Sequence, residues 1–279
     1  VYILDGLQRT HIMKELAEEG VSFRKGQKLL LEFWFERDMG NLIYRLIVLN
    51  SGQKPMSMRH QVELLFMTMQ DKLENDIPGL EMCNERDLKI RDKAKKFPFD
   101  RIVTGYHSFL NESPEISKIK IISDKLDTGR IITDQELVIL ERYKEYTKYL
   151  TQYLHLDAEA YRVYSKFKGF PSAKNWLADE NVVNSFFAAL GLLCSVPEFK
   201  KRIPKSFAKL YQLIKKTKVG GDPLALEEFD DIRQTLFDPK KYNVGYITRK
   251  TIMSCFYEYF KNEGHLTFKK CWELSKPIS

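Results

Sequence analysis

The spacing of apolar positions divides the chain into two parts of different character. Up to about residue 84, short β-branched and aromatic runs alternate with stretches whose apolar residues recur at helical spacing. This pattern predicts strands over residues 1–4 and 28–35, and either a strand or a short buried helix over 42–49. It also predicts helices over 11–19 and 58–75, the second ended by Ile77, Pro78 and Gly79.

The second part of the chain has apolar residues almost entirely at helical spacing. A helix is predicted over 97–110, and residues 116–132 are expected to form a surface connection, with or without a short pair of strands. A long helix capped by Thr133 and Asp134 follows, and further helices are expected over 158–166, 175–195, 205–216, 224–235 and 248–262. The long helix carries an inner apolar face, which predicts core packing and not a platform for stacking bases: Leu137, Leu140, Tyr143, Tyr146, Tyr149, Leu150 and Tyr153.

We therefore predict an α+β protein. A small mixed-sheet domain spans residues 1–115, and a mostly helical domain spans 116–279. Because the chain opens inside a strand without a Met, we expect a further N-terminal part to precede Val1.

Composition excludes several classes of protein. Of the 279 residues, 43% are hydrophobic and 30% are charged, which is enough apolar material to build a core and argues against disorder. No apolar run approaches the roughly 20 residues of a membrane span, and no signal peptide is recognisable. The four cysteines, Cys83, Cys194, Cys255 and Cys271, are too far apart for a metal knuckle. We expect reduced thiols and a cytoplasmic location.

The polar turn after the first predicted strand is the strongest candidate for chemistry. Asp5 and Gly6 end an apolar run, and Gln8 and Arg9 open the helix that follows. Such a turn presents free backbone N–H groups and the positive end of a helix dipole, which favours phosphate. The alternative is an ordinary strand–turn–helix with a solvated Arg9. A second polar loop over residues 50–57, between an apolar run and a capped helix, favours the phosphate site.

These two loops, in this order, carry a resemblance to a known family. The strand–D-G-x-Q-R–helix pattern and the later N-S-G-Q-K-P-M-S loop resemble the ParB/sulfiredoxin-like superfamily, in the branch marked by D-G-Q-Q-R or D-G-Q-H-R. That branch is similar to the nucleotide-hydrolysing modules of phage-defence and modification-dependent restriction proteins, and to regulators attached to DNA phosphorothioation clusters. The resemblance covers roughly residues 1–115, including the segment 99–110 within the helix predicted over 97–110.

The resemblance implies a bound nucleoside triphosphate with Mg²⁺. Asp5 would hold the metal or polarise water, Gln8 would position water or phosphate, and Arg9 would neutralise phosphate charge. The wider binding set that it implies comprises Gly6, Arg9, Thr10, Asn50, Gly52, Lys54 and Ser57. Leu7 departs from the family pattern, where Gln is usual. This departure favours nucleotide binding over hydrolysis, so NTP hydrolysis is only a candidate activity of this chain.

Two basic segments of the chain are candidates for DNA binding. The mildly basic balance, 45 Lys and Arg against 38 Asp and Glu for a net charge of +7, is compatible with nucleic acid. Residues 89–96 form one basic run. Lys200, Lys201 and Arg202 start a second, with aromatics interleaved at Phe199, Phe207 and Tyr211 and further lysines at Lys205, Lys215, Lys216 and Lys218. Such cations can follow a DNA backbone by counterion release. The alternative is a solvated basic face whose aromatics belong to the core.

The leading hypothesis is a nucleotide-binding ParB-like protein of a DNA-directed bacterial system, such as phage defence or DNA-modification-dependent restriction. The alternative is a non-enzymatic DNA-binding regulator or scaffold with the same fold. The five histidines are scattered without a His-Asn-His constellation, so no nuclease motif is evident in this chain. An effector would then be a separate subunit, and a homo-oligomer is also compatible with the sequence.

Overall fold

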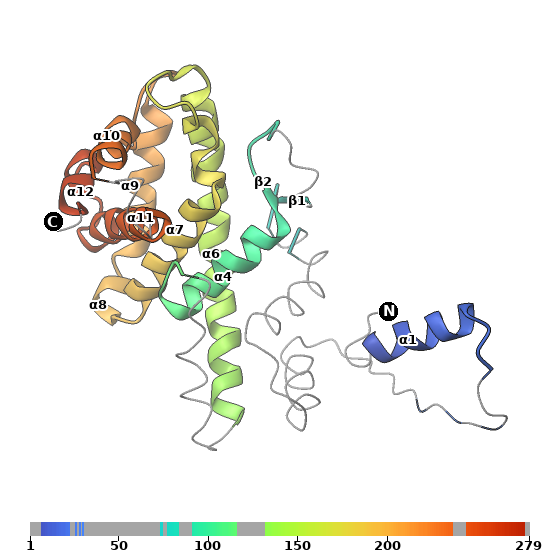
Figure 1. The fold of residues 1–279 in the computed structure, drawn as a ribbon. Helices are drawn as coiled ribbons and strands as arrows, with labels where there is room; N and C mark the ends of the chain where they lie inside the picture. Colours follow the sequence, from blue (N-terminus) through green and yellow to red (C-terminus); the bar gives the residue numbers. More distant parts are fainter. Residues whose placement is uncertain are drawn as a thin grey trace.

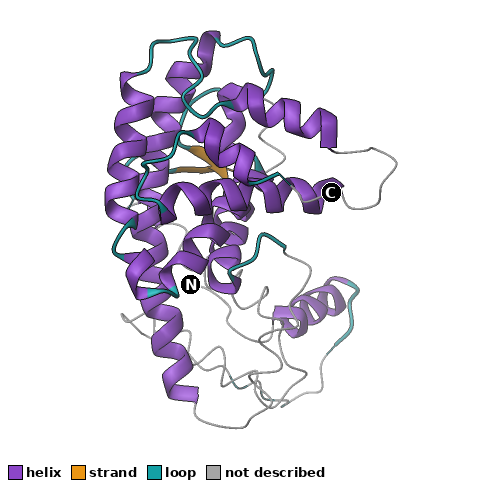
Figure 2. Cartoon of the chain, turned by 90° about the vertical axis from the view of Figure 1, so that its left-hand side faces the viewer, coloured by secondary structure: helices purple, strands orange, loops and turns teal. Residues whose placement is uncertain are grey.

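A computed structural model describes residues 7–22, 26, 28, 30, 73–74, 77–83, 91–115, 132–236 and 244–276. The part that it describes is mostly helical with one small parallel sheet, an α+β arrangement (Figures 1 and 2). The predicted strands over 1–4 and 42–49, and nearly all of that over 28–35, lie outside the described residues, as does most of the helix predicted over 58–75. Within 28–35, Lys28 and Leu30 are described and have no regular structure.

The first helix confirms a prediction from apolar spacing. Helix α1 runs from Leu7 to Glu18, so it includes nearly all of the predicted range and begins four residues earlier. On its exposed surface, Lys14 forms an ion pair with Glu18 one turn away at 3.8 Å, and Nε2 of His11 lies 3.4 Å from Glu15.

Two three-residue strands, which the sequence pattern did not predict, precede the helical part. Strand β1 (Glu81–Cys83) pairs in parallel with β2 (Lys96–Pro98), with Met82 opposite Phe97. The expected stop at residues 77–79 is confirmed, because Gly79 takes a left-handed φ of 80° and the chain turns there. Met82 and Phe97 then enter the same hydrophobic core as the helices.

Helix α4 (Phe99–Asn111) follows β2 directly, in agreement with the prediction over 97–110. Pro98 comes immediately before the helix, where its missing N–H is no loss. Glu112 ends the helix in a left-handed conformation, with φ 55°. The apolar face at helical spacing is buried: Ile102, Val103, Tyr106 and Phe109.

Helix α6 (Ile132–Val163) is a single 32-residue helix. The prediction of a separate helix over 158–166 is therefore wrong. Neither Pro nor Gly occurs between residues 132 and 163, so nothing in this stretch breaks the helix, and only a short 3₁₀ turn, η2 (Tyr164–Lys166), follows. The tyrosine stripe is a packing surface, as predicted: Tyr146, Tyr149 and Tyr153 are buried.

The remaining helices complete a layered bundle. Two of them, α8 and α12, were not predicted, and the range predicted over 175–195 divides into a 3₁₀ segment and an α-helix. In chain order they are η3 (Ala173–Ala178), α7 (Glu180–Cys194), α8 (Pro197–Lys200), α9 (Ile203–Lys216), α10 (Leu226–Leu236), α11 (Val244–Lys261) and α12 (Phe268–Leu274).

The core centres on α7, which packs against α4 on one side and α11 on the other. Its Phe186 meets rings from three other helices, with centroids 4.5 Å from Tyr153, 4.8 Å from Phe256 and 5.8 Å from Phe207. Helix α4 lies before the domain boundary expected at residue 115, yet its buried face belongs to this same core.

Among the described residues, no individual helix has both the length and the apolar character needed to cross a membrane. The pair formed by Glu180–Cys194 and Pro197–Lys216 would pass such a test only jointly, and the two are bent by 118°. Most residues of α7 are buried in the core of the bundle.

Candidate functional site

The sequence-predicted nucleotide site is only partly described. Leu7 is the first residue of α1, so Gln8, Arg9 and Thr10 lie in the first turn of that helix. Both Arg9 and Thr10 are exposed to solvent. Asp5, the predicted metal ligand, and Gly6 precede the described residues, and the second-loop residues Asn50, Gly52, Lys54 and Ser57 also lie outside them. Their juxtaposition with Arg9 therefore stays a prediction.

The basic residues at the start of the second basic segment are engaged within the protein. Lys200 forms an ion pair with Glu145, and Arg202 pairs with Glu198 and also donates a hydrogen bond of 2.8 Å to the carbonyl oxygen of Lys261. Lys201 is exposed. Acidic neighbours thus neutralise two of the three cations expected to contact DNA, Lys200 through the distant Glu145 and Arg202 through Glu198 one turn away.

The interleaved aromatics of this segment belong to the core. Phe207 is buried, and its ring stacks on Tyr149 at 6.0 Å. Phe199 and Tyr211 are partly buried and pack against the same core. The alternative in which these rings are structural is therefore confirmed.

The run over residues 89–96 also proves partly structural. Arg91 is buried and forms an ion pair with Asp157 of α6, and its Nε donates to the carbonyl oxygen of Lys96 at 3.1 Å. The carboxylate of Asp157 further accepts the backbone N–H of Lys95 at 2.7 Å. This arrangement fixes the turn before β2 against the long helix.

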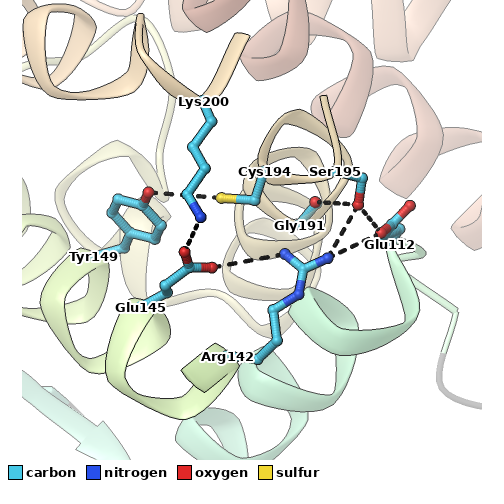
Figure 3. Close-up of polar contacts among 8 residues, drawn as sticks. All are labelled: Glu112, Arg142, Glu145, Tyr149, Gly191, Cys194, Ser195 and Lys200. Atoms are coloured by element: carbon cyan, nitrogen blue, oxygen red, sulfur yellow. Dashed lines mark hydrogen bonds and ion pairs between the residues drawn. The ribbon is translucent and has the colours of Figure 1, made fainter. Parts of the chain in front are cut away.

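A polar cluster that the sequence did not indicate joins four helices where α4 and α7 end (Figure 3). Arg142 of α6 reaches Glu112, with Nη2 3.3 Å from Oε1, and donates to Ser195 Oγ at 3.0 Å. Its Nη1 lies 3.8 Å from Glu145, which in turn pairs with Lys200 of α8. The hydroxyl of Ser195 donates to Glu112.

The charges within this cluster compensate one another. Arg142 and Lys200 are balanced by Glu112 and Glu145, and all four side chains are at most half exposed. Ser195 is hydrogen-bonded to a carboxylate that an arginine already neutralises, which is a poor base for activating a nucleophile. The members come from positions up to 88 residues apart, 112 to 200, and no local motif links them. The arrangement holds α4, α6, α7 and α8 together.

The cysteines and histidines offer no metal centre in the described ranges. Groups of three or more His, Cys, Asp or Glu side chains placed to hold a metal are not found there. His107 is buried in α4, and the amide nitrogen of Asn111 lies 3.0 Å from its Nδ1. Burial lowers the pKa of His155. His107 is thus a core histidine, whereas His155 lies on the surface of α6.

All four cysteines are described, and each is a thiol, as predicted. Cys194, Cys255 and Cys271 are buried, whereas Cys83 at the end of β1 is half-buried. Burial raises the pKa of the Cys194 thiol and of the Cys255 thiol, so both hold little reactive thiolate near neutral pH.

Titration of the native protein with a thiol reagent such as DTNB at mildly alkaline pH should therefore label Cys83 first. We expect the other three thiols to react only on addition of denaturant, and Cys83→Ser to remove the fast phase. A fast phase that persists in Cys83→Ser would contradict this assignment.

Comparison of the chain with protein-family models, with curated proteins and with solved structures gives no match in any of the three.

Proposed function

We propose that the N-terminal part of this chain binds a nucleoside triphosphate with Mg²⁺ as a ParB-like domain, within a DNA-directed bacterial system such as phage defence or modification-dependent restriction. The proposal rests on two ordered polar loops, of which the first ends in α1. One structural observation supports it: α1 begins at Leu7, immediately after Asp5 and Gly6.

That helix start is what a phosphate site at this turn requires. The first backbone N–H groups of a helix have no partner within the helix and carry the positive end of its dipole. Arg9 and Thr10 are exposed in the first turn, so a guanidinium and a hydroxyl are accessible at the same end. A guanidinium there would add bidentate charge-assisted hydrogen bonds to a phosphate.

Binding and hydrolysis make different demands on this site. Phosphoryl transfer needs a positioned water and a neutralised leaving phosphate, and the family supplies a Gln where this chain has Leu7. We therefore propose nucleotide binding as the main activity of this site. Because Leu7 stands in place of that Gln, we expect hydrolysis of the bound nucleotide to be slow.

Isothermal titration with ATP, GTP and CTP in the presence of Mg²⁺ tests the proposal on the full chain. Arg9→Ala should weaken binding by about 1.5–3 kcal/mol, the usual worth of a hydrogen bond to a charged group, which is roughly a tenfold to 150-fold rise in Kd. Lys14→Ala is the matched control, since it removes one exposed cation from the same helix outside the first turn. Absence of binding for all three nucleotides, or equal loss in both variants, would refute the site.

The second candidate is a DNA-binding regulator or scaffold that does not turn nucleotide over. Leu7 favours it, and so does the distribution of exposed lysines on the helical part. Release of inorganic phosphate separates the two candidates, because a scaffold would bind DNA without releasing phosphate.

A further inference from the structure

Two segments about 50 residues apart in the chain meet at one end of the helical bundle. Helices α6 and α9 lie side by side (Figure 1), and their C-terminal ends are joined by hydrogen bonds. Nη2 of Arg162 donates to the carbonyl oxygen of Lys215 at 3.0 Å, and the N–H of Gly220 donates to the carbonyl oxygen of Val163 at 2.7 Å. Residues 162–168 and 215–221 therefore form one continuous surface.

This surface carries cations from both segments and no acidic residue of its own. Within residues 162–168 and 215–221 the sequence contains neither Asp nor Glu. All of the cations are exposed. We call them the basic end surface: Arg162, Lys166, Lys168, Lys215, Lys216 and Lys218.

Acidic residues flank the two segments in sequence, and Glu159 and Asp222 among them already have partners. Glu159 pairs with Arg162 at 2.9 Å. Asp222 accepts hydrogen bonds from the Tyr164 hydroxyl at 2.7 Å and from two backbone N–H groups at the start of α10. The carboxylate of Glu227 lies against the backbone of Gly169. Even with Glu159 and Glu227 counted, positive charge prevails at this end.

At the opposite, N-terminal end of α9, three cations have acidic partners. There Lys200 and Arg202 are paired with Glu145 and Glu198, and Lys205 lies 4.0 Å from Glu263. The sequence places these cations and three lysines of the basic end surface, Lys215, Lys216 and Lys218, in one basic segment. Only the fold separates these neutralised cations from the five lysines of the basic end surface, for which the described ranges offer no ion pair.

Helix capping explains part of the basic end surface but not all of it. Lys and Arg in the last turn of a helix stabilise its carbonyl end, and Arg162 does this for α9 directly. Lys166 and Lys168 come after the end of α6, and Lys218 comes after the end of α9. These three contribute positive potential beyond what the two helix ends need.

We propose that the basic end surface binds the phosphate backbone of a nucleic acid. Five of its six cations are lysines, which act as point charges on flexible stems and suit sequence-independent contact with successive phosphates. The inference rests on the DNA-directed part of the proposed function and is independent of the nucleotide site at α1. It narrows the predicted DNA contact within the basic segment over residues 200–218 to Lys215, Lys216 and Lys218, and it adds Arg162, Lys166 and Lys168 from the end of α6.

Fluorescence anisotropy with the full chain and a short fluorescein-labelled DNA duplex, over about 50–200 mM salt, tests this surface. The test variant changes Lys166, Lys168, Lys216 and Lys218 to Gln. The control variant changes Lys144, Lys148, Lys201 and Lys205 to Gln, which removes the same charge from exposed positions elsewhere. Circular dichroism confirms that both variants fold.

We expect the test variant to bind at least about tenfold more weakly and its log–log salt slope to become shallower by about 3 to 4, while the control stays within about threefold of the parent chain. Equal losses in the two variants, or no binding by the parent chain, would overturn the proposal. So would binding to vesicles containing phosphatidylserine without binding to DNA, which would indicate a membrane surface. Nucleotide should bind to the test variant with the same Kd as to the parent chain. This titration therefore distinguishes a failure of the nucleotide site from a failure of the basic end surface.

Discussion

Replacing Asp157 with Ala should lower the free energy of unfolding by about 3 to 5 kcal/mol, because it leaves the charge of a buried arginine without its partner. The side chains of Arg91 and Asp157 are 2% and 1% exposed, so water cannot take over the lost contact. The same change removes the acceptor of the Lys95 N–H. Chemical denaturation followed by far-UV circular dichroism measures the loss.

Two further variants separate the buried charge from other effects. Glu198→Ala breaks an ion pair whose carboxylate is 71% exposed, so it should change the midpoint little. The double variant Arg91→Met/Asp157→Leu should be more stable than Asp157→Ala alone, because no unpaired charge stays buried. A double variant as unstable as the single one would show that packing, and not the charge, accounts for the loss.

Gly191→Ala should be the second strongly destabilising change, with a loss of about 1 to 3 kcal/mol from overpacking. A Cβ at this position would overlap the carbonyl oxygen of Phe109 and lie 3.0 Å from its carbonyl carbon. That obstacle is backbone, so α4 and α7 would have to move apart. Gly105 on the facing helix is less confined, because a Cβ there would meet side chains, the nearest being that of Val183 at 3.0 Å.

Gly245→Ala is the matched control for this change. In α11 the added Cβ would meet only the end of the flexible Arg249 side chain, at 3.3 Å. Because Ala is a better helix former than Gly, this control should be neutral or stabilising by up to about 1 kcal/mol. The thermal unfolding midpoints of the two variants should therefore shift in opposite directions, or the decrease for Gly191→Ala should be clearly larger. Equal shifts would argue against close helix packing at Gly191.

The helices were predictable wherever their apolar spacing was complete. Helices α4, α9 and α11 lie close to their predicted ranges because each has a regular apolar stripe bounded by Pro, Gly or a polar cluster. The tyrosines of α6 were assigned to packing for the same reason. The strands β1 and β2 were missed, since three residues each are too few to show alternation.

The two ends of the basic segment over residues 200–218 differ in charge compensation, and the local sequence pattern does not predict this difference. Sequence proximity groups Lys200 and Arg202 with Lys215, Lys216 and Lys218. The partners that neutralise Lys200, or that join Arg162 to Lys215, come from helices 50 or more residues away. Charge compensation is a property of spatial neighbours, so it could not be predicted from the run of lysines.

The sequence by itself determined the α+β class, most of the described helices, the buried tyrosine stripe and the presence of a helix after Asp5 and Gly6, because backbone preference and apolar periodicity act over neighbouring residues. Tertiary structure alone decided that Arg91 is buried against Asp157, and which lysines of the described ranges lack an acidic partner there. Each of these depends on contacts between distant segments, where packing and Coulomb interactions act through space and not along the chain.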